Sequence, residues 1–248
     1  MDKREVDSMT FKDFINYEKF PPLWCGGCGI IVVMNQVAKV FDELKFSKEN
    51  VSVVSGIGCT GRTAGYFALD SVHTCHGRAV AVAEGLKRGN NYMNVLVFSG
   101  DGDLLGIGLQ HLIHTARRGV DMTVVCVNNH IYAMTGGQLA PTSCKGKVTV
   151  TSPDGSVCEP VDAFNLLKGI PDVFYARTSS AHLEHMKEVV LSAVKHKGFS
   201  FVEIRTHCYT NDGAQLGLKN GGDVAKALLA EYTVGDLSKD SDLGVYND

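Results

Sequence analysis

A closely spaced cysteine pair is the first feature of the sequence that could perform chemistry. Cys25 and Cys28 lie in the segment LWCGGCG, directly before an apolar stretch that begins at Ile30. A Cys-x-x-Cys pair is either a redox-active dithiol or half of a metal site that two distant cysteines complete. The preceding segment KFPPLW is interrupted by prolines and does not read as a strand, which argues against a thioredoxin-like arrangement.

The chain contains eight cysteines, more than packing requires, and a disulfide framework explains them poorly in a reducing compartment. Cys126 lies inside the apolar run MTVVCVN and has the context of a small buried hydrophobe. Three others have polar or loop-like surroundings without a paired spacing: Cys75, Cys144 and Cys158. The remaining four stand beside glycine or at the end of an apolar run and are the candidate ligands: Cys25, Cys28, Cys59 and Cys208.

A second group of residues could hold a phosphate through a divalent cation. The segment GDGD, Gly100 to Asp103, follows a predicted strand, and its glycines would let the backbone approach a phosphate closely. The carboxylate of Asp101 would repel a bare anion, but it suits Mg²⁺ shared with phosphate oxygens, water and an amide oxygen. Asn128 and Asn129 end the next predicted strand and offer that amide. Either segment alone is compatible with an ordinary turn, whereas the pair predicts a cation–diphosphate site.

Five apolar, β-rich segments would position these residues. They are typical of parallel strands covered on both faces, and they span residues 51–56, 94–100, 122–129, 173–179 and 199–205. Helices are predicted between them, over 29–44, 105–118 and 180–197. The alternation predicts an α/β fold with a doubly wound, mostly parallel sheet that binds ligands at the carboxyl ends of its strands. We expect one domain over 1–211, including the N-terminal cysteine-bearing segment, and a loosely packed tail over 212–248.

The overall composition excludes several classes of protein. A net charge of −3 gives no electrostatic footprint for nucleic acid or for an anionic membrane surface. No apolar run approaches the roughly 20 residues that span a bilayer. The N-terminal segment MDKREVDSMTFKDF lacks the hydrophobic core of a secretion signal. The sequence therefore predicts a globular protein of the cytoplasm.

Taken together, the motifs resemble those of the β subunits of 2-oxoacid:ferredoxin oxidoreductases, in consistent order over residues 20–210. The resemblance rests on LWCGGCG, SGIGCTGR, HGRAVAVAEGLK, GDGDLLGIGLQHLIHTARRG and NNHIYAMTGGQLAPTS. It is greatest with the two-subunit enzymes that act on 2-oxoglutarate and related 2-oxoacids. The resemblance implies the thiamine diphosphate-binding fold, one [4Fe-4S] cluster on Cys25, Cys28, Cys59 and Cys208, and Mg²⁺ held by Asp101, Asn129 and the carbonyl of Ile131.

The resemblance also assigns residues around the cofactor and the substrate. Arg62, three residues after Cys59, matches a basic residue that recognises substrate, and its fork suits a carboxylate; a solvated surface arginine is the alternative. The implied cofactor-lining residues are Ile57, Gly58, Cys59, Thr60, His76, Gly77, Arg78, Gly102, Asp103, Ala133 and Met134. His76 could equally be a surface histidine. The sequence departs from the family pattern at Ala133, usually glycine, and in the segment YTNDGAQLGLKNGG after Cys208.

The implied activity is the CoA-acylating oxidative decarboxylation of 2-oxoglutarate, or the reverse fixation of CO₂. Thiamine diphosphate would accept electrons from the 2-oxoacid, the cluster would pass them to ferredoxin, and coenzyme A would take the acyl group. In this family an α subunit clamps the aminopyrimidine ring and contacts coenzyme A, which predicts an αβ or (αβ)₂ enzyme. Pyruvate or a broad range of 2-oxoacids remain open as substrates. A thiol–disulfide redox protein and a zinc-bearing assembly subunit remain alternatives from other classes.

Overall fold

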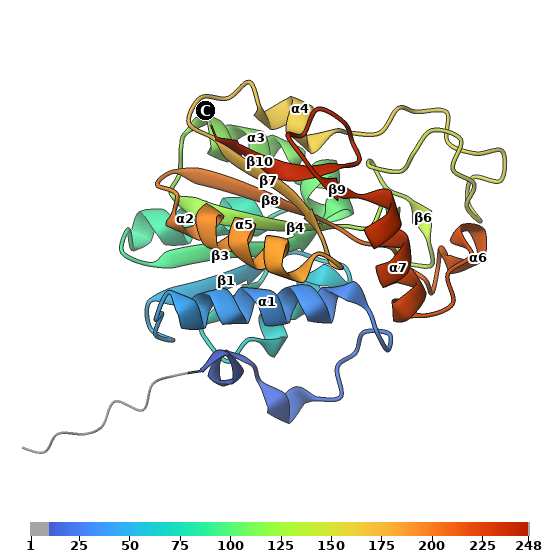
Figure 1. Ribbon diagram of the computed structural model, residues 1–248. Coiled ribbons are helices and arrows are strands. Elements are labelled where there is room, and N and C mark those ends of the chain that lie inside the picture. The colour runs from blue at the N-terminus through green and yellow to red at the C-terminus, as the bar shows by residue number, and fades with distance from the viewer. Residues whose placement is uncertain (1–9, 248) are drawn as a thin grey trace, which may run out of the picture.

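A computed structural model describes residues 10–247 and has an eight-stranded sheet at its centre (Figure 1). The strand order is β2-β1-β3-β4-β8-β7-β10-β9, and the pairs from β2 to β7 are all parallel. The strands are β1 (Val51–Ser55), β2 (Ser71–His73), β3 (Asn94–Gly100), β4 (Met122–Asn128), β7 (Phe174–Ser179), β8 (Phe199–Arg205), β9 (Thr233–Val234) and β10 (Asp242–Asn247). The predicted α/β fold with a mostly parallel sheet is confirmed.

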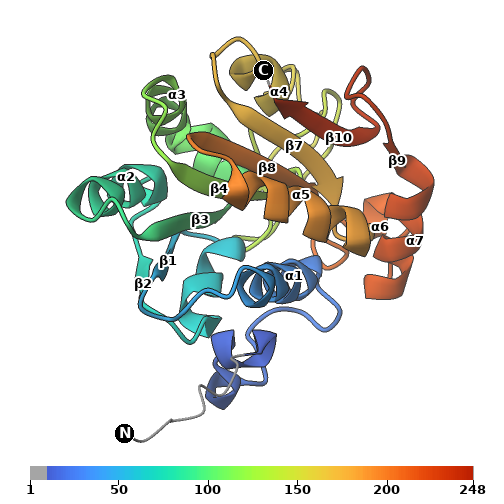
Figure 2. The same cartoon turned by 60° about the vertical axis from the view of Figure 1, so that its left-hand side comes forward.

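Helices cover both faces of this sheet (Figure 2). One face carries α1 (Gly29–Glu43) and α5 (Leu183–Lys195), and the other carries α2 (Ala79–Gly89), α3 (Leu109–Arg117) and the short α4 (Ala163–Leu167). Because both faces are covered, strands such as β4 are buried at every position. This explains why the central strands read as continuous apolar runs in the sequence.

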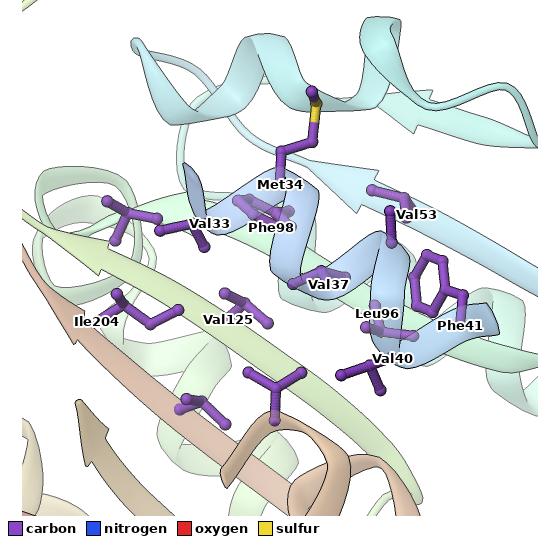
Figure 3. Close-up of a cluster of buried hydrophobic side chains, with 14 of the residues drawn as sticks. Val33, Met34, Val37, Val40, Phe41, Val53, Leu96, Phe98, Val125 and Ile204 are labelled. Carbon is purple, nitrogen blue, oxygen red and sulfur yellow. The ribbon is translucent and has the colours of Figure 1, made fainter. Parts of the chain in front are cut away.

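Helix α1 shows how the sequence pattern fixes this packing. Its buried residues recur at helical spacing, so that they form one stripe along the helix. Figure 3 shows this stripe over the side chains of β1, β3, β4 and β8; its labelled residues are Val33, Met34, Val37, Val40, Phe41, Val53, Leu96, Phe98, Val125 and Ile204. The helix therefore covers this face of the sheet, and the cysteine pair directly precedes its first turn.

Shorter elements complete the fold. The N-terminal segment forms single helical turns at Phe11–Phe14 and Tyr17–Lys19, and a longer 3₁₀ helix follows β1 at Thr60–Tyr66. A small hairpin of β5 (Ile131–Tyr132) and β6 (Gln138–Leu139) follows β4. Residues 1–9, which hold most of the segment considered as a secretion signal, lie outside the described residues, as does residue 248. Within residues 10–247, no helix is long and apolar enough to cross a membrane.

The helix predicted over 105–118 differs in the structure. A wide helical turn, Gly102–Ile107, precedes α3, and its backbone leaves helical geometry at Gly106. A Cβ at Gly106 would lie 2.8 Å from the Tyr132 hydroxyl and 3.2 Å from Pro141, so the neighbouring loop fills the space of a side chain. The kink lets the GDGD segment turn under the hairpin that follows β4.

The stretch after residue 211 is not the loosely packed tail that the sequence suggested. It contains α6 (Gly213–Leu216), α7 (Gly221–Glu231), β9 and β10, and β10 pairs antiparallel with β7. Helix α7 begins against the cysteine loop, where a Cβ at Gly221 would meet the Gly27 carbonyl oxygen at 2.3 Å. The segment was read as loose because glycine and aspartate, which are depleted in strands, are frequent in and around β9 and β10.

Candidate active site

A cavity of about 140 Å³ opens at the carboxyl ends of β1, β3 and β4. In a parallel sheet these ends meet at one edge, which is where such folds bind ligands. The loop after β3 contributes the GDGD segment, and the loop after β4 contributes Asn129 to Thr135. The predicted site residues that line this cavity are Ile57, Gly58, Cys59, Thr60, His76, Asp101, Gly102, Asp103, Asn129, Ile131, Ala133 and Met134.

Asp101 is the buried acid of this cavity, with 2% of its surface exposed. It accepts a hydrogen bond from the Thr142 hydroxyl. Burial raises the pKa of Asp101 to about 6, and hydrogen bonds from Thr142 and from the backbone of Asn129 act against that rise. Asn129 turns its side-chain oxygen toward its own loop and accepts from the Ile131 amide at 3.2 Å. A carboxylate and an amide oxygen thus lie together on neighbouring loops, a donor set that fits a hard divalent cation.

Asp103, also 2% exposed, holds the loops of this cavity together. One carboxylate oxygen accepts from the backbone amides of Ile57 at 3.0 Å and Gly77 at 2.8 Å, and from Nδ1 of His76 at 2.5 Å. The other accepts from the Ser99 hydroxyl at 2.7 Å. The carboxylate therefore joins the loops after β1 and β2 to the end of β3. Its predicted contact with a diphosphate stays a prediction.

Gly102 is glycine for a reason that the sequence did not reveal. A Cβ at this position would lie 2.2 Å from the ring of Tyr132, whose hydroxyl donates to the Gly102 carbonyl at 3.0 Å. A side chain would therefore push the hairpin after β4 away from the GDGD loop. The glycine permits a close approach between two protein loops at the cavity, in addition to any approach to a phosphate.

The four candidate cysteines line a second cavity, of about 240 Å³, beside the first. Burial raises the pKa of the Cys28 thiol to about 11, and the charges of Cys59, Cys208 and Cys25 add to the rise, so the four sulfurs interact electrostatically. Among residues 10–247, no group of three His, Cys, Asp or Glu side chains is arranged to hold a single metal ion. The cysteines therefore surround a space without forming a preassembled mononuclear site.

Hydrogen bonds outside the thiols fix the three cysteine-bearing segments against one another. Trp24 donates through its indole nitrogen to the Cys59 carbonyl at 2.7 Å. The Tyr209 hydroxyl donates to the Gly26 carbonyl at 2.6 Å. These contacts bring together residues far apart in sequence. The two cavities have four lining residues in common: Cys59, Asn129, Ala133 and Met134.

Comparisons with known proteins agree with this geometry. The family "Thiamine pyrophosphate enzyme, C-terminal TPP binding domain" matches residues 56–204. The chain is 41% identical, over 89% of its length and 76% of the relative's, to the 2-oxoglutarate synthase subunit KorB of Methanothermobacter thermautotrophicus. It is 37% identical, over 75% of its length and 59% of the relative's, to subunit beta of 2-oxoacid:ferredoxin oxidoreductase 1 of Aeropyrum pernix. The chain belongs to the 2-oxoacid:ferredoxin oxidoreductase β-subunit family.

A solved structure supports the same assignment. The 2-oxoglutarate:ferredoxin oxidoreductase of Magnetococcus marinus, solved with 2-oxoglutarate, coenzyme A and succinyl-CoA bound, superimposes with a TM-score of 0.83 at 30% identity. The match covers 96% of this chain and 78% of that one. The chain is therefore a subunit of an oxidoreductase that works with a partner subunit, as the sequence motifs predicted.

Three of the residues predicted to contact the cofactor or the substrate do not line the first cavity. The Gly77 amide donates a hydrogen bond to the Asp103 carboxylate at 2.8 Å. Arg78 approaches Nε2 of His111 at 3.2 Å and donates to the Gly77 carbonyl at 3.3 Å. Arg62 is exposed and lines the cysteine cavity instead, where its charge opposes the rise in the pKa of Cys59. Their predicted roles toward cofactor and substrate stay predictions.

The sequence did not point to several residues around the site. Thr142 contacts Asp101, and Asn211 donates to the Ala133 carbonyl at 2.6 Å, which ties the loop after Cys208 to the shared wall of the two cavities. Glu203 and Arg205 went unnoticed within a strand that read as apolar. Their spacing carried a signal, since residues two apart on a strand share a face, and two buried charges of opposite sign there favour a polar network.

Proposed function

We propose that this chain is the β subunit of a CoA-acylating 2-oxoglutarate:ferredoxin oxidoreductase, with an α subunit as partner. The observation that carries the proposal is the shared wall of the two cavities: Cys59 lines both the thiamine diphosphate candidate site and the cysteine cavity. An electron donor and an electron acceptor bound in these cavities would be in adjacent positions. The choice of 2-oxoglutarate as substrate and of ferredoxin as electron acceptor follows the names of the similar proteins.

The residues of this chain fit the groups that the proposal requires. Asp101, Asn129 and the Ile131 carbonyl would hold Mg²⁺, and the GDGD loop would face the diphosphate. Cys25, Cys28, Cys59 and Cys208 would hold a [4Fe-4S] cluster, for which a Cys-x-x-Cys pair completed by two distant cysteines is an accepted set. When bound, thiamine diphosphate supplies an electron sink for decarboxylation and the cluster supplies one-electron transfer.

The protein's own part is to orient these groups and to keep their surroundings fixed. Asp103 holds the loops after β1, β2 and β3 in one arrangement, so that Cys59 and the GDGD segment keep their relative positions. Asn211 fixes the Ala133 carbonyl at the wall between the cavities. The α subunit would complete the site over the aminopyrimidine ring and bind coenzyme A. Residues 1–211 would form the catalytic domain, and the described part of the segment 212–248 packs against it through β10.

Anaerobic co-purification with a candidate α subunit tests the proposal. We expect a brown αβ complex that reduces ferredoxin with 2-oxoglutarate, and that requires both coenzyme A and thiamine diphosphate. A preference of the complex for pyruvate would change the proposed substrate but not the proposed reaction class. Bound zinc without iron would instead support an assembly subunit, and a reducible Cys25–Cys28 disulfide without metal a dithiol protein.

Arg62 should contribute to substrate selection. It lines the cysteine cavity, and within residues 10–247 it forms no ion pair, so its guanidinium is available to a carboxylate. A bidentate contact of this kind is worth about 1.5–3 kcal/mol. We therefore expect Arg62→Ala to lower kcat/KM by about tenfold to a hundredfold. The measurement is steady-state kinetics of the αβ complex.

The pattern across substrates tells which carboxylate Arg62 holds. Loss confined to 2-oxoglutarate, with pyruvate and 2-oxobutyrate unaffected, would identify the distal carboxylate. Equal loss for all three would identify the carboxylate that every 2-oxoacid carries. Unchanged kinetics for all three would return Arg62 to the solvated surface. Arg88, which pairs with Glu84 on α2, is a suitable control for loss of a surface arginine.

A further inference from the structure

A network of buried charges crosses the sheet beside the candidate cation site. Glu203 on β8 is 2% exposed and accepts from the Tyr175 hydroxyl at 2.5 Å and from the Asn128 side chain at 2.6 Å. Arg177 donates to it through Nε at 3.0 Å, and Nε of Arg205 lies 3.1 Å away. Burial alone would raise the pKa of Glu203, but Arg205 and Arg177 outweigh burial and hold it well below its usual range. The carboxylate is thus a fixed negative charge that anchors two arginines.

Asn128 is the first connection from this anchor to the cation site. The sequence offered both asparagines of the pair as amide ligands, but the Asn128 side chain turns away from the cavity toward Glu203. Its oxygen accepts from the His130 amide at 3.1 Å. The start of the turn that carries Asn129 and Ile131 is therefore tied to the buried carboxylate.

Arg205 provides the second connection, through the ring of His130. Its Nη1 lies 2.6 Å from His130 Nε2, and its Nη2 donates to Asp240 at 2.8 Å. A guanidinium can only donate, so Nε2 accepts and the ring proton is on Nδ1. That proton is donated to the Thr142 carbonyl at 2.8 Å. A neutral imidazole thus bridges Arg205 and Thr142, and the Thr142 hydroxyl in turn donates to Asp101.

The backbone of His130 explains why such a bridge matters. Its φ is 59°, in the left-handed region that residues with a Cβ adopt only at a cost. Glycine would take this conformation freely. The candidate ligands Asn129 and Ile131 flank this residue directly, so the geometry of the turn sets the positions of their oxygens. The two hydrogen bonds of the ring hold a turn that the backbone alone disfavours.

We propose that His130 and Arg205 are positioning residues for the cation: they hold the turn of Asn129 and Ile131, and through Thr142 the carboxylate of Asp101, in the geometry that binds Mg²⁺. Asp240, between β9 and β10, holds the far side of the Arg205 fork. The C-terminal segment thereby takes part in cofactor binding without touching the cofactor. The inference rests on the proposed Mg²⁺ site.

The test removes the ring and spares the backbone. His130→Gly keeps the left-handed conformation accessible but loses both ring hydrogen bonds. Since loss of a partner that orients a metal ligand typically lowers metal affinity by about 10–100-fold, we expect the Mg²⁺ concentration for half-maximal thiamine diphosphate binding to rise by a similar factor. Equilibrium dialysis of the cofactor-free αβ complex measures it. If His130→Gly needed the same or a lower Mg²⁺ concentration than the natural chain, the proposal would be overturned.

Two arginines anchored on the same carboxylate provide a matched pair of variants. Arg205→Lys keeps the charge but loses the fork that reaches His130, whereas Arg177→Lys disturbs the same ion network without contact to His130. We expect both to lower thermal stability, and only Arg205→Lys to raise the Mg²⁺ concentration for half-maximal thiamine diphosphate binding. An equal rise in this Mg²⁺ concentration for both variants would mean that the network acts through stability alone, and the proposal would fail.

Two further readouts separate positioning from general damage. Both substitutions break the same contact, the one between Arg205 and His130. The double variant His130→Gly/Arg205→Lys should therefore need no more Mg²⁺ for half-maximal cofactor binding than the more affected single variant. Additive losses would argue against the link. The EPR spectrum of Mn²⁺ bound in place of Mg²⁺ should broaden in His130→Gly, because its ligands lose their fixed geometry, while the iron content per chain stays full. An unchanged Mn²⁺ spectrum would contradict the proposal.

Asp101→Ala distinguishes this inference from the proposed function. If Asp101→Ala leaves Mg²⁺-dependent cofactor binding intact, the cation site itself is wrong and the positioning role falls with it. If Asp101→Ala abolishes binding while His130→Gly and Arg205→Lys behave as the natural chain, the cation site stands and only the positioning role is wrong.

Discussion

Replacing Asp101 with alanine should abolish Mg²⁺-dependent binding of thiamine diphosphate by the αβ complex. The carboxylate is buried in the candidate cofactor cavity, and alanine offers no ligand in its place. Without a cation to bridge them, protein and diphosphate would meet without charge compensation. The loss should exceed the roughly 10–100-fold that removal of an outer partner of a metal ligand costs. Titration calorimetry of the cofactor-free complex at fixed MgCl₂ measures it.

Asp121 supplies the control for this substitution. It precedes β4 at the opposite end of that strand from Asn129 and pairs with Lys87 at 3.1 Å. Asp121→Ala should bind the cofactor as the natural chain does. Iron content should stay full in Asp101→Ala, because Asp101 lies outside the cysteine cavity. Unaltered cofactor affinity in Asp101→Ala would mean that GDGD and the asparagine pair are ordinary turns.

The parts of the site that the sequence predicted are those set by local chemistry. GDGD and the asparagine pair each follow a strand that reads as buried, and parallel strands present their carboxyl ends at one edge. Two neighbouring strand exits with complementary ligands therefore predicted one site, and the structure brings Asp101 and Asn129 into one cavity. Local context singled out the four cysteines, but their assignment to one cluster needed the family resemblance, because spacing alone linked Cys25 only to Cys28.

The contacts that the sequence did not predict depend on tertiary pairing. Glu203 lies opposite Arg177 only because β7 and β8 pair in that register, and no local pattern gives the register. Asn128 looked equivalent to Asn129 as an amide ligand, and only the buried carboxylate beside it sends its side chain the other way. Strand β10 was missed for a similar reason, since its partner β7 is distant in sequence and only the first half of β10 is buried.

The cluster assignment leads to the second large effect. Serine at Cys25, Cys28, Cys59 or Cys208 should remove most of the iron and sulfide from anaerobically prepared protein. A serine hydroxyl does not ionise near neutral pH and is a poor substitute for a thiolate ligand of iron. The four cysteines line one cavity and come from three segments, so loss of any one thiolate leaves the set of four incomplete. Iron and sulfide analysis, with the visible spectrum of the anaerobic protein, measures the loss.

The other four cysteines are the internal controls. Cys75, Cys144 and Cys158 are exposed and lie outside the cysteine cavity, so serine at each should leave the iron content unchanged. Cys126 is buried in the core, where alanine is the gentler substitution. Cys208 is the most telling of the proposed ligands, because the sequence departs from the family pattern directly after it. Its place is nevertheless fixed by Tyr209 on Gly26 and by Asn211 on Ala133. If Cys208→Ser kept full iron, a different residue would have to complete the cluster, and the loop after β8 would serve only to close the cavity.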